Sequence, residues 1–521
     1  MKELVYHRLL LPSLENNADK VAFIDGDYHG TYAQHGERVM RLCSALKSEL
    51  GLDPGDRFAV MSMNNHEYLE AYHAAFLGAG AVNPLNLRLA GKELAYIVQN
   101  SGCKVAFVDA AFADHFHRSL DEIEGPNPVE HTVLIGDGDV PHDVTYDELL
   151  AAGEPTVPDE PEEDDPVVLM YTGGTTGLPK GVLLDHRAEM LNLYHIGVEL
   201  DFRPESVFLH QTPMFHAASM GGIIGTPAVG GTSVFIPMFD PGAVLELIET
   251  ENVTQTVMVP TMIGMLLNHP DFEPERLASL EQLAYGASPM PRATLDRLRE
   301  LYPDLELAQA YGMTEASAVV TWLGPEGHGN KGLLGSAGRP VFGVTIQIQD
   351  PEGNEVPRGE NGEVCIRAGN LMREYWRNPE ATEEVFRGGW YHSGDAGYLN
   401  DDGYLFLVDR VKDMIVTGGE NVYSAEVENA ISSMPEVDQV AVIGIPSEQW
   451  GEAVLAIVVL HEEGSVTEDD VRAWAKERIA GYKVPKSVEF RTEPLPLSGA
   501  LKVLKKDLRK PYWEGQERAV G

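Results

Sequence analysis

The sequence predicts an α/β fold in which a large N-terminal domain of layered α/β subdomains carries a small β-barrel and is followed by a smaller α+β domain. Short apolar runs rich in β-branched and aromatic residues, such as 105–108 and 233–236, alternate with longer helical stretches such as 295–301. This alternation favours layers of helices on largely parallel sheets. A chain of 521 residues is also too long for one ordinary domain.

The pattern of the chain changes near residue 340. Strand-like runs at 344–349 and 363–367 are separated by turns rich in Gly and Asp. Such turns are typical of antiparallel strands with tight connections. We therefore expect a small antiparallel barrel or a distorted sheet that completes the large domain.

The last part of the chain has the pattern of a separate domain. It contains two helical candidates, 425–434 and 468–480, and a strand candidate at 453–460. Its length is ordinary for an independent domain. We therefore divide the chain into domains 1–409 and 410–521.

The chain is strongly acidic, with 81 Asp and Glu residues against 39 Lys and Arg and a formal net charge of −42. Such a charge repels nucleic-acid phosphates and anionic lipid surfaces, so it argues against nucleic-acid binding and against membrane binding driven by bulk charge. Any site for a phosphate compound must therefore be local. A homodimer and a weak peripheral contact with a membrane stay open.

Cysteine usage and hydropathy favour a cytoplasmic protein. Cys43, Cys103 and Cys365 are far apart and fit reduced, buried thiols better than a disulfide framework. The N-terminus lacks the apolar core of a signal peptide. The longest stretch without Asp, Glu, Lys or Arg, 206–239, contains prolines and clustered glycines that exclude a transmembrane helix. We expect buried helix and strand pieces around a cavity there.

The strongest local signal is the segment YTGGTTGLPKG at 171–181. Glycines let the backbone turn N–H groups toward an anion, hydroxyls donate further hydrogen bonds, and a lysine adds a point charge. The segment lacks Walker A spacing and is followed by another apolar run, so we expect the loop to join two strands. A plain glycine-rich hairpin turn would not need these residues together. The candidate residues of this polyphosphate cradle are Thr172, Gly173, Gly174, Thr175, Thr176, Gly177 and Lys180.

Two weaker segments allow two interpretations each. Tyr311 could stack on a nucleobase while Thr314 and Glu315 hold a phosphate and its magnesium ion. Taken alone, the same segment is a strand end with a hydrogen-bonded tyrosine. Asp395 follows a Ser-Gly turn, where its carboxylate could accept ribose hydroxyls or form an Asx-turn.

Three other features are weak evidence for a functional site when each is taken alone. His216 lies in the uncharged stretch, where a lone histidine is more often a hydrogen-bonded core residue than a base. Lys502 in isolation is a surface lysine. Residues 327–332 match GxGxxG, but we expect no strand before them and no helix after them, which indicates a loop and not a dinucleotide site.

Taken together and in this order, YTGGTTGLPKG, YGMTE, YHSGD, DRVKDMIVTGGENVYSAEVE and the terminal lysine segment resemble the acyl-adenylate-forming (AMP-binding) superfamily. The likeness covers nearly the whole chain. The block 409–428 and the triplet 450–452 look most like the fatty and aryl acyl-CoA synthetase branch. The resemblance implies that the C-terminal domain is mobile and is joined to the large domain near 410–412, with Lys412 at the hinge.

The resemblance also implies roles for individual residues. It assigns the Thr172 to Lys180 loop to the β- and γ-phosphates of ATP, with Thr172 and Glu315 beside Mg²⁺. Lys502 would bridge the substrate carboxylate and the α-phosphate. The other nucleotide positions are Tyr311 on the adenine, Thr314 near the α-phosphate, Asp395 and Arg410 on the ribose, and Gly286, Ala287, Gly312 and Met313. The CoA positions are Gly418, Gly419 and Glu420, and the acyl-pocket positions are His216, Met220 and Gly221.

The function implied is ATP-dependent conversion of a carboxylic acid through acyl-AMP to a CoA thioester, with Lys502, Thr314 and Glu315 as catalytic residues and with AMP and pyrophosphate as products. The uncharged stretch 206–239 favours a medium- or long-chain fatty acid over an aryl acid. Two alternatives stay open. The enzyme could load an aryl or fatty acyl group onto CoA or a carrier protein, or the chain could be a non-catalytic nucleotide-binding homologue. Leu501, which stands where the family usually has Gly, gives a reason for the second alternative.

Overall fold

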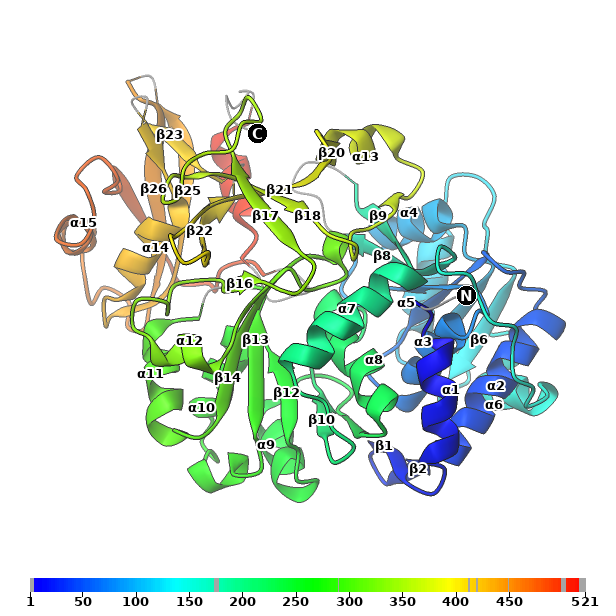
Figure 1. Cartoon of the computed structure of the whole chain (residues 1–521). Coiled ribbons are helices and arrows are strands. Elements are labelled where there is room, and N and C mark those ends of the chain that lie inside the picture. The colour runs from blue at the N-terminus through cyan, green and yellow to red at the C-terminus, as the bar shows by residue number, and fades with distance from the viewer. Residues whose placement is uncertain are drawn as a thin grey trace. The chain divides into compact units, whose positions relative to one another are not determined.

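A computed structural model describes residues 4–172, 178–288, 290–410, 413–417, 420–447, 449–497 and 503–514; for Arg410, Glu420 and Asn421 it describes the backbone alone. The chain forms two compact units (Figure 1). The first comprises Met1–Thr345 and Arg367–Glu384, and the second comprises Ile346–Ile366 and Val385–Gly521. The predicted domain boundary at residue 410 stays a prediction.

The first unit contains two large, mainly parallel sheets. One has eight strands in the order β19-β9-β8-β4-β3-β5-β6-β7. The other has nine strands in the order β16-β15-β14-β13-β12-β10-β11-β1-β2. The strands of the first sheet are β3 (Arg57–Met61), β4 (Ala81–Pro84), β5 (Val105–Asp109), β6 (His131–Ile135), β7 (Val144–Thr145), β8 (Pro166–Thr172), β9 (Lys180–Asp185) and β19 (Glu374–Tyr375). Those of the second are β1 (Val21–Asp25), β2 (Tyr28–Thr31), β10 (Val207–His210), β11 (Thr232–Phe235), β12 (Gln255–Met258), β13 (Gln282–Gly286), β14 (Glu306–Tyr311), β15 (Thr321–Leu323) and β16 (Arg339–Pro340).

Helices connect the parallel strands, and Figure 1 shows α9, α10 and α11 flanking the strands β12 to β14. Several helices begin at a clear sequence signal. The Asp185 side chain accepts a hydrogen bond from Ala188 N–H at the start of α7, and Thr31 forms a capping box with Gln34 at the start of α2. The helices associated with these two sheets are α1 (His7–Asn16), α2 (Tyr32–Ser48), α3 (His66–Phe76), α4 (Gly91–Ser101), α5 (Ala113–Leu120), α6 (Tyr146–Ala152), α7 (His186–Glu199), α8 (Met220–Val229), α9 (Pro241–Thr250), α10 (Pro260–Leu267), α11 (Arg292–Leu301), α12 (Pro325–Gly329) and α13 (Pro379–Val385), with 3-10 turns η1 (Ala217–Ser219), η2 (Pro274–Leu277) and η3 (Thr314–Ala316).

The second unit contains two five-stranded sheets. The first has the order β17-β18-β21-β20, with β22 also paired to β21, and its pairings β18–β21, β20–β21 and β21–β22 are antiparallel. Its strands are β17 (Thr345–Gln349), β18 (Gly362–Arg367), β20 (Phe386–Arg387), β21 (Trp390–Leu399) and β22 (Leu405–Arg410). Register shifts interrupt the pairings of β21 with both β18 and β22. Of the two expected forms, the distorted sheet therefore describes this part of the chain.

The second sheet of this unit is buried on both faces. It has the order β24-β23-β26-β25, with β27 also paired to β26. On β25, Val442 packs in the cluster that also contains Val427 of α14 and Val471 of α15, whereas Ile443 packs in the cluster that contains Leu508 of α16. Because neighbouring side chains of a strand point to opposite faces, α16 covers the face opposite α14 and α15. The elements are β23 (Ile415–Thr417), β24 (Glu420–Val422), β25 (Val437–Ser447), β26 (Gly451–Leu460), β27 (Ser487–Arg491), α14 (Ser424–Ser432), α15 (Glu468–Lys476), α16 (Lys505–Arg509) and the 3-10 turn η4 (Lys510–Tyr512).

Most expected elements are present, and one expectation is wrong. The strands expected at 105–108, 233–236 and 453–460 and the helices expected at 295–301, 425–434 and 468–480 correspond to β5, β11, β26, α11, α14 and α15. The GxGxxG segment is not a plain loop. Its first residues lie in α12, which begins at Pro325, a favoured first helical residue, and which follows strand β15. Strand β15 pairs antiparallel with β14, so this is not the parallel unit that binds dinucleotides.

The uncharged stretch 206–239 contains the short elements β10, η1, α8 and β11, so the expected helix and strand pieces are present. Helix α8 has ten residues and contains Pro227. Within the described residues, no helix is long and apolar enough to cross a membrane. Cys43, Cys103 and Cys365 are buried free thiols, as expected.

Candidate active site

The predicted phosphate loop joins two antiparallel strands, as expected. Thr172 at the end of β8 pairs in register with Lys180 at the start of β9. The Thr172 hydroxyl donates a hydrogen bond of 3.5 Å to the Lys180 carbonyl. Five of the seven residues between them, Gly173, Gly174, Thr175, Thr176 and Gly177, lie outside the described residues. The hairpin therefore fixes where the loop leaves and re-enters the sheet.

Tyr375 connects Lys180 to Glu315. The Lys180 ammonium lies 4.8 Å from the centre of the Tyr375 ring, and the Tyr375 hydroxyl donates a hydrogen bond of 2.9 Å to Glu315 Oε1. Tyr375 is in β19, which pairs with β9 directly beside the phosphate hairpin. A cation, a phenol and a carboxylate are thus collected from three segments distant in sequence.

The turn that carries Thr314 and Glu315 has an unusual backbone. It follows β14, continues through η3, and then has Ser317 at φ 50° and Ala318 at φ 97°. A Cβ atom at Gly312 would lie 1.7 Å from the Ala318 carbonyl oxygen, so only glycine fits that position. Backbone strain of this kind persists where the surrounding structure enforces it.

Asn370 supplies part of that enforcement. Its Nδ2 donates hydrogen bonds to the carbonyls of Ala316 (2.8 Å) and Val319 (2.9 Å), and the Ser317 hydroxyl donates one of 3.0 Å to the Asn370 carbonyl. The backbone N–H of Met372 also donates to the Glu315 carbonyl, at 2.7 Å. Hydrogen bonds from the segment 370–375 therefore fix the backbone of this turn. Sequence reasoning missed Asn370 and Tyr375, since neither belongs to a motif and both lie more than 50 residues from the turn.

The strand next to β14 brings in Gly286 and Ala287. Gly286 pairs in register with Ala310, and a Cβ atom at Gly286 would lie 2.5 Å from the Ala310 carbonyl oxygen. Ala287 has a left-handed backbone at φ 67°. The carboxyl ends of β13 and β14 therefore place Gly286 and Ala287 beside Tyr311, at the edge of a parallel sheet where ligands usually bind.

The predicted acyl-pocket residues follow the carboxyl end of β10. The Asn64 side chain donates hydrogen bonds to the carbonyls of His210 (3.0 Å) and Thr212 (3.1 Å) and accepts one from Met214 N–H (2.8 Å). His216 is the N-cap residue of η1, where its Nδ1 accepts a hydrogen bond of 3.2 Å from Ala218 N–H. Met220 is buried at the start of α8. The roles of His216, Met220 and Gly221 in an acyl pocket stay predictions.

The glycines of α8 pack directly against neighbouring side chains. A Cβ atom would lie 3.2 Å from Ile196 at Gly221, 2.3 Å from the Phe208 ring at Gly222, and 2.3 Å from the Phe202 ring at Gly225. The two phenylalanine rings therefore occupy the space that side chains at Gly222 and Gly225 would need.

In the second unit, Asp395 of β21 and Arg410 of β22 are register partners. Asp395 is buried, and its N–H donates a hydrogen bond of 3.1 Å to the Ser393 hydroxyl. Glu363 supports the preceding turn: it accepts a hydrogen bond from Gly394 N–H (3.2 Å) and lies 2.8 Å from His392 Nδ1. The structure thus brings together the two residues predicted for the ribose.

The remaining predicted positions are described only in part. Lys412, Gly418, Gly419 and Lys502 lie outside the described residues, and Glu420 is described as backbone of β24. Residues Leu497 and Val503, on either side of the Lys502 loop, pair as an antiparallel bridge.

The chain matches the model of the AMP-binding enzyme family over residues 12–376 and that of the AMP-binding enzyme C-terminal domain over residues 426–502. It belongs to the AMP-binding enzyme family. It is 40% identical to a feruloyl-CoA synthase of Amycolatopsis sp. over 484 residues, which cover 92% of this chain and 94% of that protein. It is 36% identical to a long-chain-fatty-acid–CoA ligase of Mycobacterium tuberculosis over 489 residues, 93% of this chain and 94% of that one.

Solved structures agree with this family. ATP-bound MatB from Rhodopseudomonas palustris superposes with a TM-score of 0.86 at 28% identity, covering 98% of this chain and 99% of the other. The predicted superfamily and fold class are therefore confirmed, and so is the predicted enzyme class, an AMP-forming acid–thiol ligase.

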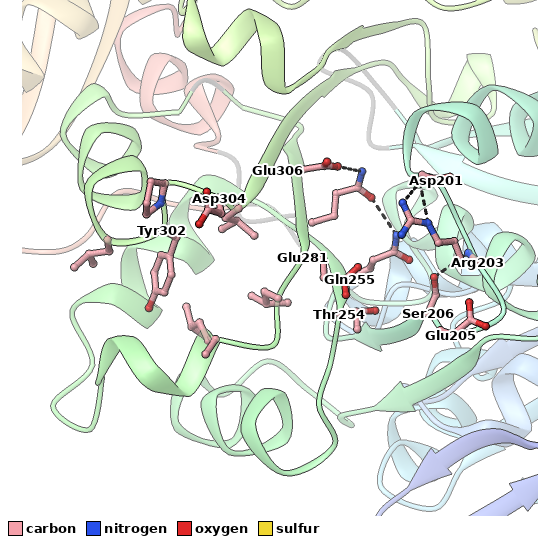
Figure 2. Close-up of a pocket in the computed structure, with 17 residues that line it drawn as sticks. Asp201, Arg203, Glu205, Ser206, Thr254, Gln255, Glu281, Tyr302, Asp304 and Glu306 are labelled. Atoms are coloured by element: carbon pink, nitrogen blue, oxygen red, sulfur yellow. Dashed lines mark hydrogen bonds and ion pairs between the residues drawn. The ribbon is translucent and has the colours of Figure 1, made fainter.

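This AMP-binding enzyme also has a cavity of about 730 Å³ (Figure 2). None of the predicted site residues lines it. It is lined at the amino ends of β10, β12, β13 and β14, opposite the edge that carries Tyr311 and Gly286. A row of side chains crosses it, in which Gln255 donates to Gln282 (3.1 Å) and Gln282 donates to Glu306 (3.2 Å). Five Asp or Glu residues line it against one Arg, so it disfavours a polyphosphate.

Proposed function

We propose that this enzyme is an ATP- and Mg²⁺-dependent acyl-CoA synthetase that converts a compact aryl acid to acyl-AMP and then to its CoA thioester. The observation that carries the proposal is the contact chain Lys180–Tyr375–Glu315 beside the phosphate hairpin. A family member that had lost catalysis would have no need to hold these three groups together.

The chemistry explains this arrangement. A carboxylate that attacks the α-phosphorus of ATP is one anion approaching another, so positioned cations must offset the repulsion as charge develops. In this proposal Lys180 binds the outer phosphates, and its position at the start of β9 beside the phosphate hairpin supports that role. The Thr172 hydroxyl and the Glu315 carboxylate are oxygen donors of the kind that Mg²⁺ prefers, and a bound Mg²⁺ would neutralise phosphate charge.

The other roles are proposed by family likeness. Thr314 faces the α-phosphate, Tyr311 the adenine, and Asp395 with Arg410 the ribose. Lys502 contacts the substrate carboxylate and the α-phosphate during adenylation. Gly418, Gly419 and Glu420 serve the thioester step, and the chain turns at Lys412 between the two half-reactions.

The packing of α8 supports a compact acid. The rings of Phe202 and Phe208 and the side chain of Ile196 fill the space beside its three glycines. With the acyl pocket proposed beside α8, this packing leaves little room for a long acyl chain. The 40% identity to a feruloyl-CoA synthase supports an aryl group. A medium- or long-chain fatty acid is the second candidate, favoured by the uncharged stretch and by the long-chain relative.

The test is mass spectrometry of the enzyme with ATP, Mg²⁺ and CoA and a panel that contains ferulate, benzoate, octanoate and palmitate. We expect aryl-CoA as the main product, with AMP and pyrophosphate, and no product when Mg²⁺ is chelated. Palmitoyl-CoA as the main product would replace the aryl proposal by the fatty-acid candidate. Acyl-AMP without thioester would indicate a carrier-protein acceptor, and bound ATP without either product would indicate a non-catalytic homologue.

A further inference from the structure

Helix α16 begins three residues after the proposed catalytic Lys502. The base of the Lys502 loop is closed by the Leu497–Val503 bridge and by a hydrogen bond of 2.8 Å from Leu504 N–H to the Pro496 carbonyl. Leu508 anchors the helix in the apolar cluster on one face of the β25–β26 sheet. Whatever fixes α16 therefore also fixes one end of that loop.

Lys505, the first residue of α16, is held by two side chains. Its ammonium lies 2.8 Å from Glu428 Oε1 and donates a hydrogen bond of 2.6 Å to the Ser424 hydroxyl. Glu428 Oε1 also accepts a hydrogen bond of 2.7 Å from Val442 N–H, which fixes it to the sheet. Burial opposes the charged form, but the carboxylates of Glu428 and Asp409 raise the pKa of Lys505, so it stays an ammonium at neutral pH.

Ser424 also contacts Asp409, in the segment that precedes the proposed hinge. Its hydroxyl donates a hydrogen bond of 2.7 Å to Asp409 Oδ2, and its backbone N–H donates to the same oxygen. Asp409 directly precedes Arg410, the register partner of Asp395. One continuous path thus runs from Lys505 through Ser424 to the strand that carries the proposed ribose residues.

The other end of α16 reaches the segment that follows the hinge. Arg509 donates a hydrogen bond of 2.7 Å to Asp413 Oδ1, and both side chains are at least four-fifths buried. Lys505 and Arg509 therefore both contact residues that follow 410–412, and only Ser424 continues the connection to Asp409 on the other side. A turn of the chain at Lys412 would separate Ser424 from Asp409, whereas Arg509 and Asp413 lie on the same side of Lys412.

We propose that Lys505 is a positioning residue for adenylation, which ties the Lys502 loop through Ser424 to Asp409 and so holds that loop in place for the first half-reaction. The inference rests on the proposed function, in which Lys502 acts in adenylation. The thioester step, after the chain has turned at Lys412, does not use this link. Loss of Lys505 should therefore affect one half-reaction and spare the other.

The experiment measures the two half-reactions separately on the full-length enzyme. Adenylation is followed as acid-dependent exchange of labelled pyrophosphate into ATP, and the thioester step as CoA thioester formed from synthetic acyl-AMP. The variants are Lys505→Ala, Lys505→Arg and Ser424→Ala. Lys506→Ala is the matched control, because Lys506 is the exposed neighbour on the same helix.

We expect Lys505→Ala to lower the adenylation kcat by roughly 10- to 100-fold, since a loop misplaced by about 1 Å loses that much rate. The KM for ATP and the thioester rate should stay within about twofold of those of the natural enzyme. Lys505→Arg keeps the charge and should restore most of the rate. Ser424→Ala should act in the same direction, and Lys506→Ala should change neither step.

Equal loss of both half-reactions, or no loss in either, would overturn the proposal. So would a loss of adenylation in Lys506→Ala as large as that in Lys505→Ala. If Lys505→Ala does not fold, Ser424→Ala decides by the same comparison of the two half-reactions. Lys502→Ala separates the two proposals: if it keeps full adenylation, the assignment of Lys502 in the proposed function fails, whatever Lys505→Ala does.

Discussion

The Tyr375 hydroxyl donates a 2.9 Å hydrogen bond to Glu315 while its ring lies under the Lys180 ammonium. One side chain thus orients a carboxylate proposed to face Mg²⁺ and a cation proposed to face the outer phosphates. Because the two functions use different parts of the tyrosine, a substitution can separate them.

Tyr375→Phe keeps the ring below Lys180 and removes the hydrogen bond to Glu315. We expect a higher Mg²⁺ requirement and an adenylation rate lower by about tenfold, the value of roughly one charge-assisted hydrogen bond. Titration of Mg²⁺ at fixed ATP measures this effect. Thermal unfolding should change little, and an unchanged Mg²⁺ dependence would contradict the role of Tyr375 in orienting Glu315.

Gly312→Ala tests the turn after β14. The added Cβ would meet the Ala318 carbonyl oxygen at 1.7 Å, so the turn must shift, and ATP binding should weaken by at least tenfold. Gly264→Ala in α10 is the control, since nothing lies within 4 Å of its Cβ position. That change should stabilise the protein by about 0.5–1 kcal/mol. Calorimetric ATP titration and thermal unfolding measure the pair, and equal ATP affinity in both variants would refute the prediction.

Glu189 makes stability depend on pH. It is 1% exposed on α7, and burial raises its pKa to about 8. The folded-state pKa thus lies above the unfolded value of about 4.5. Below about pH 4.5 Glu189 is protonated in both states and does not lower the free energy of unfolding. As the pH rises from about 4.5 to about 8, the unfolded state loses its proton first, and the free energy of unfolding falls by a few kcal/mol in total.

Glu189→Gln removes the ionisable group, so we expect it to be more stable than the natural enzyme at pH 8 and similar at pH 5. Urea denaturation at both pH values measures the difference. Glu246→Gln, an exposed change on α9, should show no such dependence. The prediction is wrong if Glu189→Gln and Glu246→Gln have the same pH profile.

Phe202→Leu tests the substrate proposal. It opens space beside Gly225 of α8, so kcat/KM for octanoate should rise relative to an aryl acid. Stability should fall by about 1–2 kcal/mol, as for other losses of buried volume. Phe58→Leu in β3 is the control, because it removes the same volume from a fully buried ring in the other large sheet. If both variants change acid preference equally, α8 does not limit acyl length.

Much of the site was predictable because its signals are local. Glycines, threonines and a lysine between two apolar runs predict a hairpin that carries an anion loop, and β8 and β9 form that hairpin. Tyr311 to Glu315 follow an apolar run and lie at the end of β14. The prediction of a plain loop around 327–332 was wrong because a five-residue helix that begins at Pro325 has too weak a periodicity to see.

The sequence by itself determined the family, the strands and helices, and the residues whose motifs specify phosphate chemistry, because these depend on neighbours a few positions apart. Only the tertiary structure decided that Tyr375 and Asn370 hold the Glu315 turn, that rings fill the space beside α8, and that Lys505 reaches Asp409 through Ser424. The hydrogen bonds of Tyr375 to Glu315, Ser424 to Asp409 and Lys505 to Ser424 join residues from 15 to more than 80 positions apart. No local pattern encodes them, since a tyrosine or a lysine gains such a role only when the packed sheets bring its partner within hydrogen-bonding distance.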